Sequence, residues 1–158
     1  MALSRGRRLG IDVGLARIGI AVSDPDSILA TPVETLQVSD GPKNTAAPWG
    51  REITRVLDLA REYDAVAVVV GLPASLAGRH TQSTEMAQSF CEQLATVLPE
   101  EVELRTTDER LSTVQATGQL HSAGKNAKKQ RSIIDQAAAV AILQSWIDSQ
   151  RAAPDALS

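Results

Sequence analysis

The unbroken apolar segment from Ala65 to Val70 constrains the fold of this chain more than any other feature. It contains only alanine and the β-branched residue valine, and Gly71-Leu72-Pro73 follows it directly. A short apolar run that ends at turn-forming residues is typical of a strand covered on both faces. The rest of the chain must therefore supply neighbouring strands and helices for both sides of a sheet.

The first strands are predicted by alternation. Within residues 7–13, Leu9, Ile11 and Val13 alternate with smaller or polar residues, and residues 18–23 repeat this pattern. The four residues between Val13 and Ile18 include Gly14 and have the length of a hairpin loop, so we expect an antiparallel hairpin. Residues 33–38 are a candidate third strand, and residues 39–48, with two prolines and a glycine, read as a loop.

Helical periodicity alternates with strands in the remaining sequence. Helices are expected over residues 51–63, 82–97, 110–121 and 132–147, and a strand is expected around residues 102–104. The second of these helices should bury a stripe formed by Met86, Phe90, Leu94 and Val97. The fold class is therefore α/β, a mixed sheet that opens with an antiparallel hairpin and is flanked by helices. With 158 residues we expect one domain over residues 1–147 and a flexible tail over 148–158.

Composition indicates a cytoplasmic protein with no membrane partner. The longest apolar run, residues 65–72, is far shorter than the ~20 residues that a bilayer-spanning helix needs. No apolar signal-peptide segment precedes Leu9. The single cysteine, Cys91, excludes an internal disulfide framework and lies on an apolar helix stripe, where a small buried side chain is expected.

Overall charge argues against nucleic acid, but its distribution does not. The net charge is −3 and only four residues are aromatic, so neither a basic surface nor a base-stacking platform is evident. Residues 105–131, however, hold six of the sixteen bases and two of the nineteen acids. These bases are either a solvated loop or ligands for phosphate groups, which they would hold without reading sequence. The candidates for nucleic-acid binding are Arg110, Lys125, Lys128, Lys129 and Arg131.

One acid lies in the middle of the first strand. An ionised carboxylate at Asp12 must be paired or solvated, because its burial costs several kcal/mol otherwise. It can bond to neighbouring backbone or to Arg17, or it can bind a metal ion while Gly10 and Gly14 let a phosphate backbone approach.

Two further acidic positions lie where helices are expected to begin. Asp108 and Glu109 follow a strand and are either an N-cap and a first-turn acid or ligands at the carboxyl end of that strand. Asp135 completes the pattern Ser132-x-x-Asp135, so it is either the acid of a capping box or a residue that the following alanines bring close to the sheet. Three carboxylates brought together would suit Mg²⁺ or Mn²⁺.

The ordered set of motifs resembles the YqgF family, also called RuvX-like, of Holliday junction resolvases or pre-ribosomal-RNA nucleases. The resemblance extends from about Leu9 to Asp148. It is carried by the segments 10–14, 17–24, 70–73 and 108–113, by Gly78 and Lys128-Lys129, and by residues 134–139.

The resemblance implies an RNase H-like three-layer fold and a metal-dependent nuclease site. The family's strand aspartate falls on Asp12, its middle acid on Glu109, with Asp108 as the alternative, and its helix aspartate on Asp135. These three would be the catalytic residues and would hold Mg²⁺ or Mn²⁺. Distant resolvases carry a fourth acid, where this chain has Ala138.

The expected activity is endonucleolytic hydrolysis of structured nucleic acid by a monomer or homodimer. Processing of the 5′ end of pre-16S rRNA is the first expectation, and cleavage of branched DNA is the second. A nucleic-acid-binding module that does not cleave is a third possibility. An actin-like ATPase is disfavoured, because such enzymes need two subdomains and a second phosphate loop.

Overall fold

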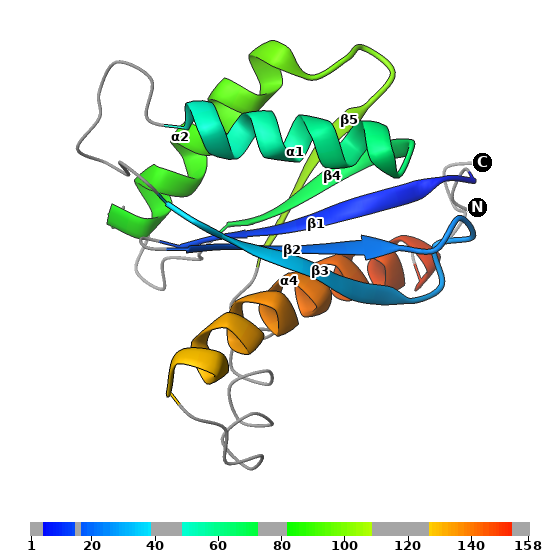
Figure 1. The fold of residues 1–158 in the computed structure, drawn as a ribbon. Helices are drawn as coiled ribbons and strands as arrows, with labels where there is room; N and C mark the ends of the chain where they lie inside the picture. The colour runs from blue at the N-terminus through cyan, green and yellow to red at the C-terminus, as the bar shows by residue number, and fades with distance from the viewer. Residues whose placement is uncertain (1–4, 15–16, 39–48, 73–81, 109–126, 153–158) are drawn as a thin grey trace.

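The five strands form one mixed sheet in the order β3-β2-β1-β4-β5 (Figure 1). The computed structural model describes residues 5–14, 17–38, 49–72, 82–108 and 127–152. The strands are β1 (Arg7–Val13), β2 (Arg17–Ser23), β3 (Ala30–Gln37), β4 (Ala65–Leu72) and β5 (Glu103–Asp108). The described helices are α1 (Gly50–Glu62), α2 (Gln82–Val97) and α4 (Ala127–Ala152).

The expected hairpin and the doubly covered strand are both confirmed. β1 pairs antiparallel with β2, and β2 pairs antiparallel with β3, which begins at Ala30 rather than at residue 33. β4 pairs in parallel with both β1 and β5. The interior of β4 is buried except for the half-buried Val66, as its apolar sequence predicts.

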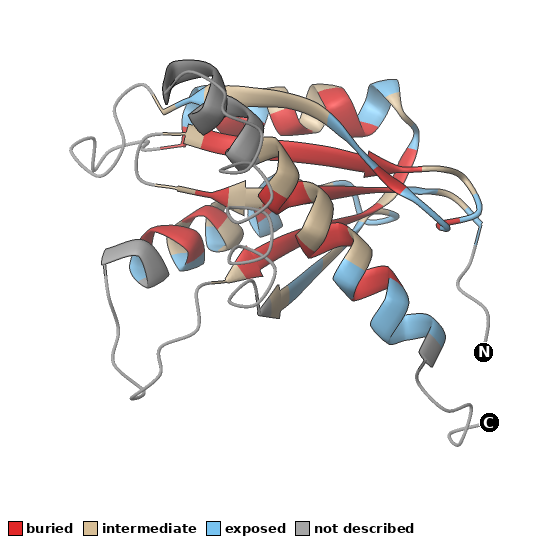
Figure 2. Cartoon of the chain, turned by 90° about the horizontal axis from the view of Figure 1, so that it is seen from below, coloured by how far each residue is buried: buried red, intermediate tan, exposed pale blue. Residues whose placement is uncertain are grey.

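The sheet separates two hydrophobic cores. The odd-numbered residues Leu9 and Ile11 of β1 face the core beneath α1 and α2, with Phe90 and Leu94 from α2. On the other face, Val69 of β4 packs in a second core with residues of α4. Figure 1 shows α1 and α2 on one side of the sheet and α4 on the other. Figure 2 shows the long buried stretches of the strands.

Helix α2 has the expected bounds, but its apolar stripe is shorter than predicted. Met86, Phe90 and Leu94 are buried, whereas Val97 is 48% exposed, so its predicted burial is wrong. Val97 is the last residue of the helix and reaches past the main core. Cys91 is half-buried against the core, and burial raises the pKa of its thiol to about 11, so the thiol is protonated at neutral pH.

Helix α4 is longer at both ends than the predicted 132–147. It begins at Ala127, because the polar residues before Ser132 are good helix formers. It ends at Ala152, so the segment expected to be a tail begins as helix. Arg151 donates a hydrogen bond to the backbone oxygen of Asp26 (3.2 Å), which ties this last turn to the loop between β2 and β3.

Residues expected to form the loop 39–48 and the helix 110–121 lie outside the described ranges, and so does the end of the chain after Ala152. The single-domain assignment therefore stays a prediction. No helix in the described part of the chain is long and apolar enough to cross a bilayer.

Candidate functional site

Asp12 lies in a row of paired residues that crosses the whole sheet. It pairs with Gly19 of β2 on one side and with Gly71 of β4 on the other. Gly19 in turn pairs with Thr35, and Gly71 pairs with Thr107. We call these five residues the Asp12 row. Since β1, β4 and β5 are parallel, the row lies near the shared carboxyl edge of the three strands, where open α/β sheets bind their ligands.

The two glycines leave room on both sides of Asp12. Paired residues on adjacent strands project from the same face of a sheet, and Gly19 and Gly71 have no side chain to cover their neighbour. Both glycines are buried, and Asp12 itself is half-buried. A half-buried carboxylate between two glycines is accessible to a bulky anionic group such as a phosphodiester, provided that a cation neutralises the charge.

The flanking glycines are not the ones expected from the sequence. A Cβ atom added to Gly10 would lie 2.6 Å from Cβ of Leu143 and 2.9 Å from the backbone oxygen of Ala139, so Gly10 is covered by α4. Gly14 belongs to the hairpin turn, where its N–H donates to the oxygen of Arg17 (2.9 Å). The predicted role of Gly10 in admitting phosphate is therefore wrong, because α4 covers the position, whereas the role of Gly14 stays a prediction.

Helix α4 crosses the sheet at the level of the Asp12 row. Nε2 of Gln136 donates a hydrogen bond to Oγ1 of Thr35 at 3.1 Å, which fixes this part of the helix over the row. The next turn carries Ala138 and Ala139, which are 1% and 0% exposed. As expected from the sequence, these small side chains allow the helix to pack closely on the sheet.

The structure places Asp135 on α4, immediately before Gln136. Asp135 is about two turns into the helix, so its interpretation as the acid of a capping box at a helix start is wrong. Lys128, Lys129 and Arg131 also lie on α4 and not in a loop, because the helix begins at Ala127. Glu109, Arg110 and Lys125 lie outside the described residues.

Asp108 is the last residue of β5 and pairs with Leu72, one position beyond the Asp12 row. β5 and β1 are separated only by β4, so the backbones of Asp108 and Asp12 are about 10 Å apart across the sheet. Within the described side chains there is no group of three acidic, histidine or cysteine residues placed to hold a metal ion. Glu109, together with the side chains of Asp108 and Asp135, falls outside that set.

Arg17 is a candidate that the sequence arguments considered only as a partner for Asp12. It begins β2 two residues before Gly19, so it shares the sheet face of Asp12 and lies one step nearer the hairpin loop. Thr107 was also not singled out. Arg17 is two residues from Gly19, and Thr107 pairs directly with Gly71, so both are found only once the sheet register is known.

Two solved structures have the same architecture as this chain. RuvC of Thermus thermophilus in complex with Holliday junction substrate matches with a TM-score of 0.53 and 18% identity, over 93% of this chain and 96% of that one. The yeast mitochondrial Holliday junction resolvase Ydc2 matches with a TM-score of 0.56 and 9% identity, over 96% and 81%. The expected RNase H-like fold is confirmed.

The family is shown by sequence. The family model described as RuvX, Holliday junction resolvase, matches residues 6–149. A Corynebacterium jeikeium protein named "Putative pre-16S rRNA nuclease" is 50% identical over 94% of this chain and 90% of its own length. A Mycobacterium tuberculosis protein of the same name is 53% identical over 94% and 82%. This chain belongs to the RuvX family.

Proposed function

We propose that this protein is a divalent-metal-dependent endonuclease that processes the 5′ end of pre-16S rRNA. The observation that carries the proposal is the half-buried carboxylate of Asp12 between two glycines, at the carboxyl edge of an RNase H-like sheet. The names of relatives at 50–53% identity support the choice of substrate.

The donor set fits a hard divalent cation. Asp12, Glu109 and Asp135 would hold Mg²⁺ or Mn²⁺, and Asp108 is an alternative for the middle position. The Gln136–Thr35 hydrogen bond supports this grouping, because it holds the turn of α4 that includes position 135 beside the Asp12 row. Position 135 is also four residues before Ala139, so both lie on the same face of α4. Ala139 lies over Gly10 of β1.

Hydrolysis requires a water molecule to attack phosphorus while the bond to the leaving oxygen breaks. The bound cation would lower the pKa of that water and stabilise charge on the leaving oxygen. The carboxylates of the chain would orient the cation, and the glycines at positions 19 and 71 would leave space for the sugar-phosphate backbone. Arg17 and the bases of α4, Lys128, Lys129 and Arg131, would contact adjacent phosphates.

Cleavage of branched DNA is the second candidate, because the matching family model is described as a Holliday junction resolvase. A module that binds without cleaving is the third. These possibilities differ in products, so one assay separates them: pre-16S rRNA and a four-way DNA junction incubated side by side with Mg²⁺, Mn²⁺ or EDTA.

Asp12→Asn is the variant that tests the site. It should reduce cleavage by at least about a hundredfold while the thermal melt stays nearly unchanged, because the amide keeps the shape but removes the negative charge. Asp148→Asn, which changes an exposed acid at the far end of α4, is the matched control and should cleave normally. Full activity of Asp12→Asn, or cleavage in EDTA, would show that the proposed mechanism is wrong.

A further inference from the structure

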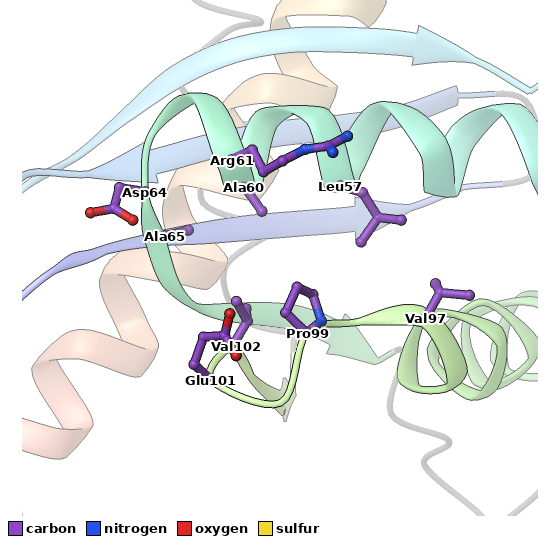
Figure 3. Close-up of a pocket in the computed structure, with 9 residues that line it drawn as sticks. All are labelled: Leu57, Ala60, Arg61, Asp64, Ala65, Val97, Pro99, Glu101 and Val102. Carbon is purple, nitrogen blue, oxygen red and sulfur yellow. The ribbon is translucent and has the colours of Figure 1, made fainter.

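A pocket opens at the amino edge of the sheet, where β4 and β5 begin (Figure 3). Its volume is about 310 Å³, and it lies between the end of α1, the end of α2 and the connection from α2 to β5. Ala65 lines this pocket, while Gly71 at the other end of β4 belongs to the Asp12 row. Six residues of strand, about 20 Å, separate the two sites.

The floor of the pocket is apolar. It is formed by Leu57 and Ala60 of α1, Val97 of α2, and Pro99 and Val102 of the following connection. The 48% exposure of Val97 is unusual in this chain, where the exposed large apolar residues among those described are Val97, Ile28 and Leu29. An exposed valine beside four further apolar residues provides a surface for an aliphatic chain.

The rim of the pocket carries two acidic side chains. Asp64 and Glu101 lie near one end of it, and Val97 lies at the other (Figure 3). Arg61 is the only base among the lining residues, and its guanidinium extends along α1 to Asp58 at 2.7 Å. Among the described residues, neither Asp64 nor Glu101 has an ion pair through its side chain.

The segment that forms α2 and leads into β5 adds further negative charge. Residues 81–104 contain five acids and no lysine, arginine or histidine. The last turn of α2 ends at the pocket without a base to offset the negative end of the helix dipole. The side of the pocket formed by α2 and the α2–β5 connection is therefore acidic and favours a cation over a phosphate group.

We propose that this pocket binds a basic segment of a partner protein through one arginine or lysine side chain. The aliphatic stem of that side chain would pack on Leu57, Val97 and Val102, and its cationic end would lie between Asp64 and Glu101. An arginine or lysine side chain suits both the apolar floor and the acidic rim of the pocket, since its stem is apolar and its end is positively charged. A bare metal ion would leave the apolar floor uncovered.

The probe is a short synthetic peptide, acetyl-Ala-Leu-Arg-Leu-Ala-amide, titrated into the isotopically labelled full-length chain and followed by amide chemical shifts. We expect saturable shifts at the lining residues, above all Val97, Glu101 and Val102. The same peptide with citrulline in place of arginine is a neutral isostere and should bind at least about tenfold more weakly, because it cannot form charge-assisted hydrogen bonds.

Two double variants separate a specific pocket from general attraction to an acidic protein. Asp64→Asn/Glu101→Gln should weaken binding of the arginine peptide at least about tenfold. Glu62→Gln/Glu100→Gln makes the same change in net charge at nearby exposed positions outside the pocket lining and should bind normally. Cleavage of nucleic acid should be equal in both, so failure here leaves the nuclease assignment untouched.

Three outcomes would overturn the proposal. The first is equal binding of the citrulline peptide, and the second is equal weakening by the two double variants. The third is concentration-dependent self-association that Asp64→Asn/Glu101→Gln abolishes, because a second copy of the chain would then occupy the pocket.

Discussion

At the scale of single residues, the carboxylate of Asp24 organises the loop between β2 and β3. Its Oδ1 accepts hydrogen bonds from the N–H groups of Ile28 and Leu29, both at 2.7 Å, and its Oδ2 accepts one from Asp26 at 3.0 Å. The bond from Leu29 is the main cause that lowers the pKa of Asp24 below its ordinary value, with smaller contributions from Ile28 and Asp26. The charged form is therefore favoured in the folded state.

The effect of Asp24 on stability should depend on pH. A carboxyl group with a lowered folded-state pKa stabilises the protein above its ordinary pKa, and this contribution disappears as pH falls through the folded-state value. Asp24→Asn should lower the free energy of unfolding by about 1 kcal/mol at neutral pH, where solvent screening limits the loss. Urea unfolding in acid, at a pH below the folded-state pKa, should show a much smaller difference. A difference that is constant with pH would contradict this explanation.

Two residues with left-handed backbone conformations should respond in opposite ways to glycine. Asp64 has φ +53° after α1, and Ser27 has φ +52° in the loop after β2. Asp64 is exposed, so Asp64→Gly should raise the free energy of unfolding by about 0.5–1 kcal/mol by removing the backbone penalty. The hydroxyl of buried Ser27 accepts from Nη1 of Arg8 at 2.6 Å, so Ser27→Gly should instead be destabilising. Chemical denaturation of the two variants checks the sign of each change.

At the scale of elements, Gly10 determines how closely α4 packs on the sheet. Gly10→Ala places a methyl group 2.6 Å from Cβ of Leu143, so the helix must shift, at a cost of about 1–3 kcal/mol. The shift would also move the helix at the Asp12 row and reduce cleavage. Gly50→Ala is the matched control, since a Cβ atom there meets nothing within 4 Å at the start of α1. Urea unfolding should show Gly50→Ala neutral or slightly stabilised. An equal decrease in the free energy of unfolding of both variants would exclude a steric cause.

The elements themselves were largely predictable from local patterns. The strands β1, β2 and β4 and the bounds of α2 follow from alternation, from an apolar run and from helical spacing. The start of α4 was not predictable in this way, because the favourable capping pattern at Ser132 lies inside a segment whose helix propensity continues upstream. Val97 was misassigned because helical periodicity does not reveal where the underlying core ends.

At the scale of the whole molecule, the two proposed binding sites lie at opposite edges of the sheet. The proposed nucleic-acid contacts lie at the carboxyl edge, and the acidic pocket lies at the amino edge. With few aromatic residues available for stacking, binding to RNA should rest on phosphate contacts and weaken steeply with salt.

Substitutions at the two ends of α4 test where nucleic acid binds. Lys128→Ala should reduce the slope of log affinity against log salt by about one, as expected for one lost phosphate contact. Arg151→Ala, at the other end of the same helix, should leave that slope unchanged. Filter binding with a catalytically inactive Asp12→Asn background measures both. An unchanged slope for Lys128→Ala would remove this residue from the proposed interface.

The candidate site was only partly accessible to sequence arguments. Asp12 was recognisable because a carboxylate in the middle of an apolar strand needs an explanation. Its true neighbours, Gly19 and Gly71, depend on the pairing of three strands, and register is a long-range property that local spacing does not contain. The proposal of Asp12, Glu109 and Asp135 as a metal-binding set therefore still rests on the family resemblance and on the position of α4.

The separation of the two cores by the sheet determines which residues are energetically coupled. Leu9 and Gly10 are adjacent in the chain, but Leu9 packs with the core beneath α1 and α2 while Gly10 packs against Leu143. Double-mutant cycles should thus find near-additivity between neighbours on β1 and strong non-additivity between Gly10 and Leu143, from opposite ends of the sequence. The energetic coupling between residues of this chain is therefore determined by the face of the sheet that they share, and not by their separation along the backbone.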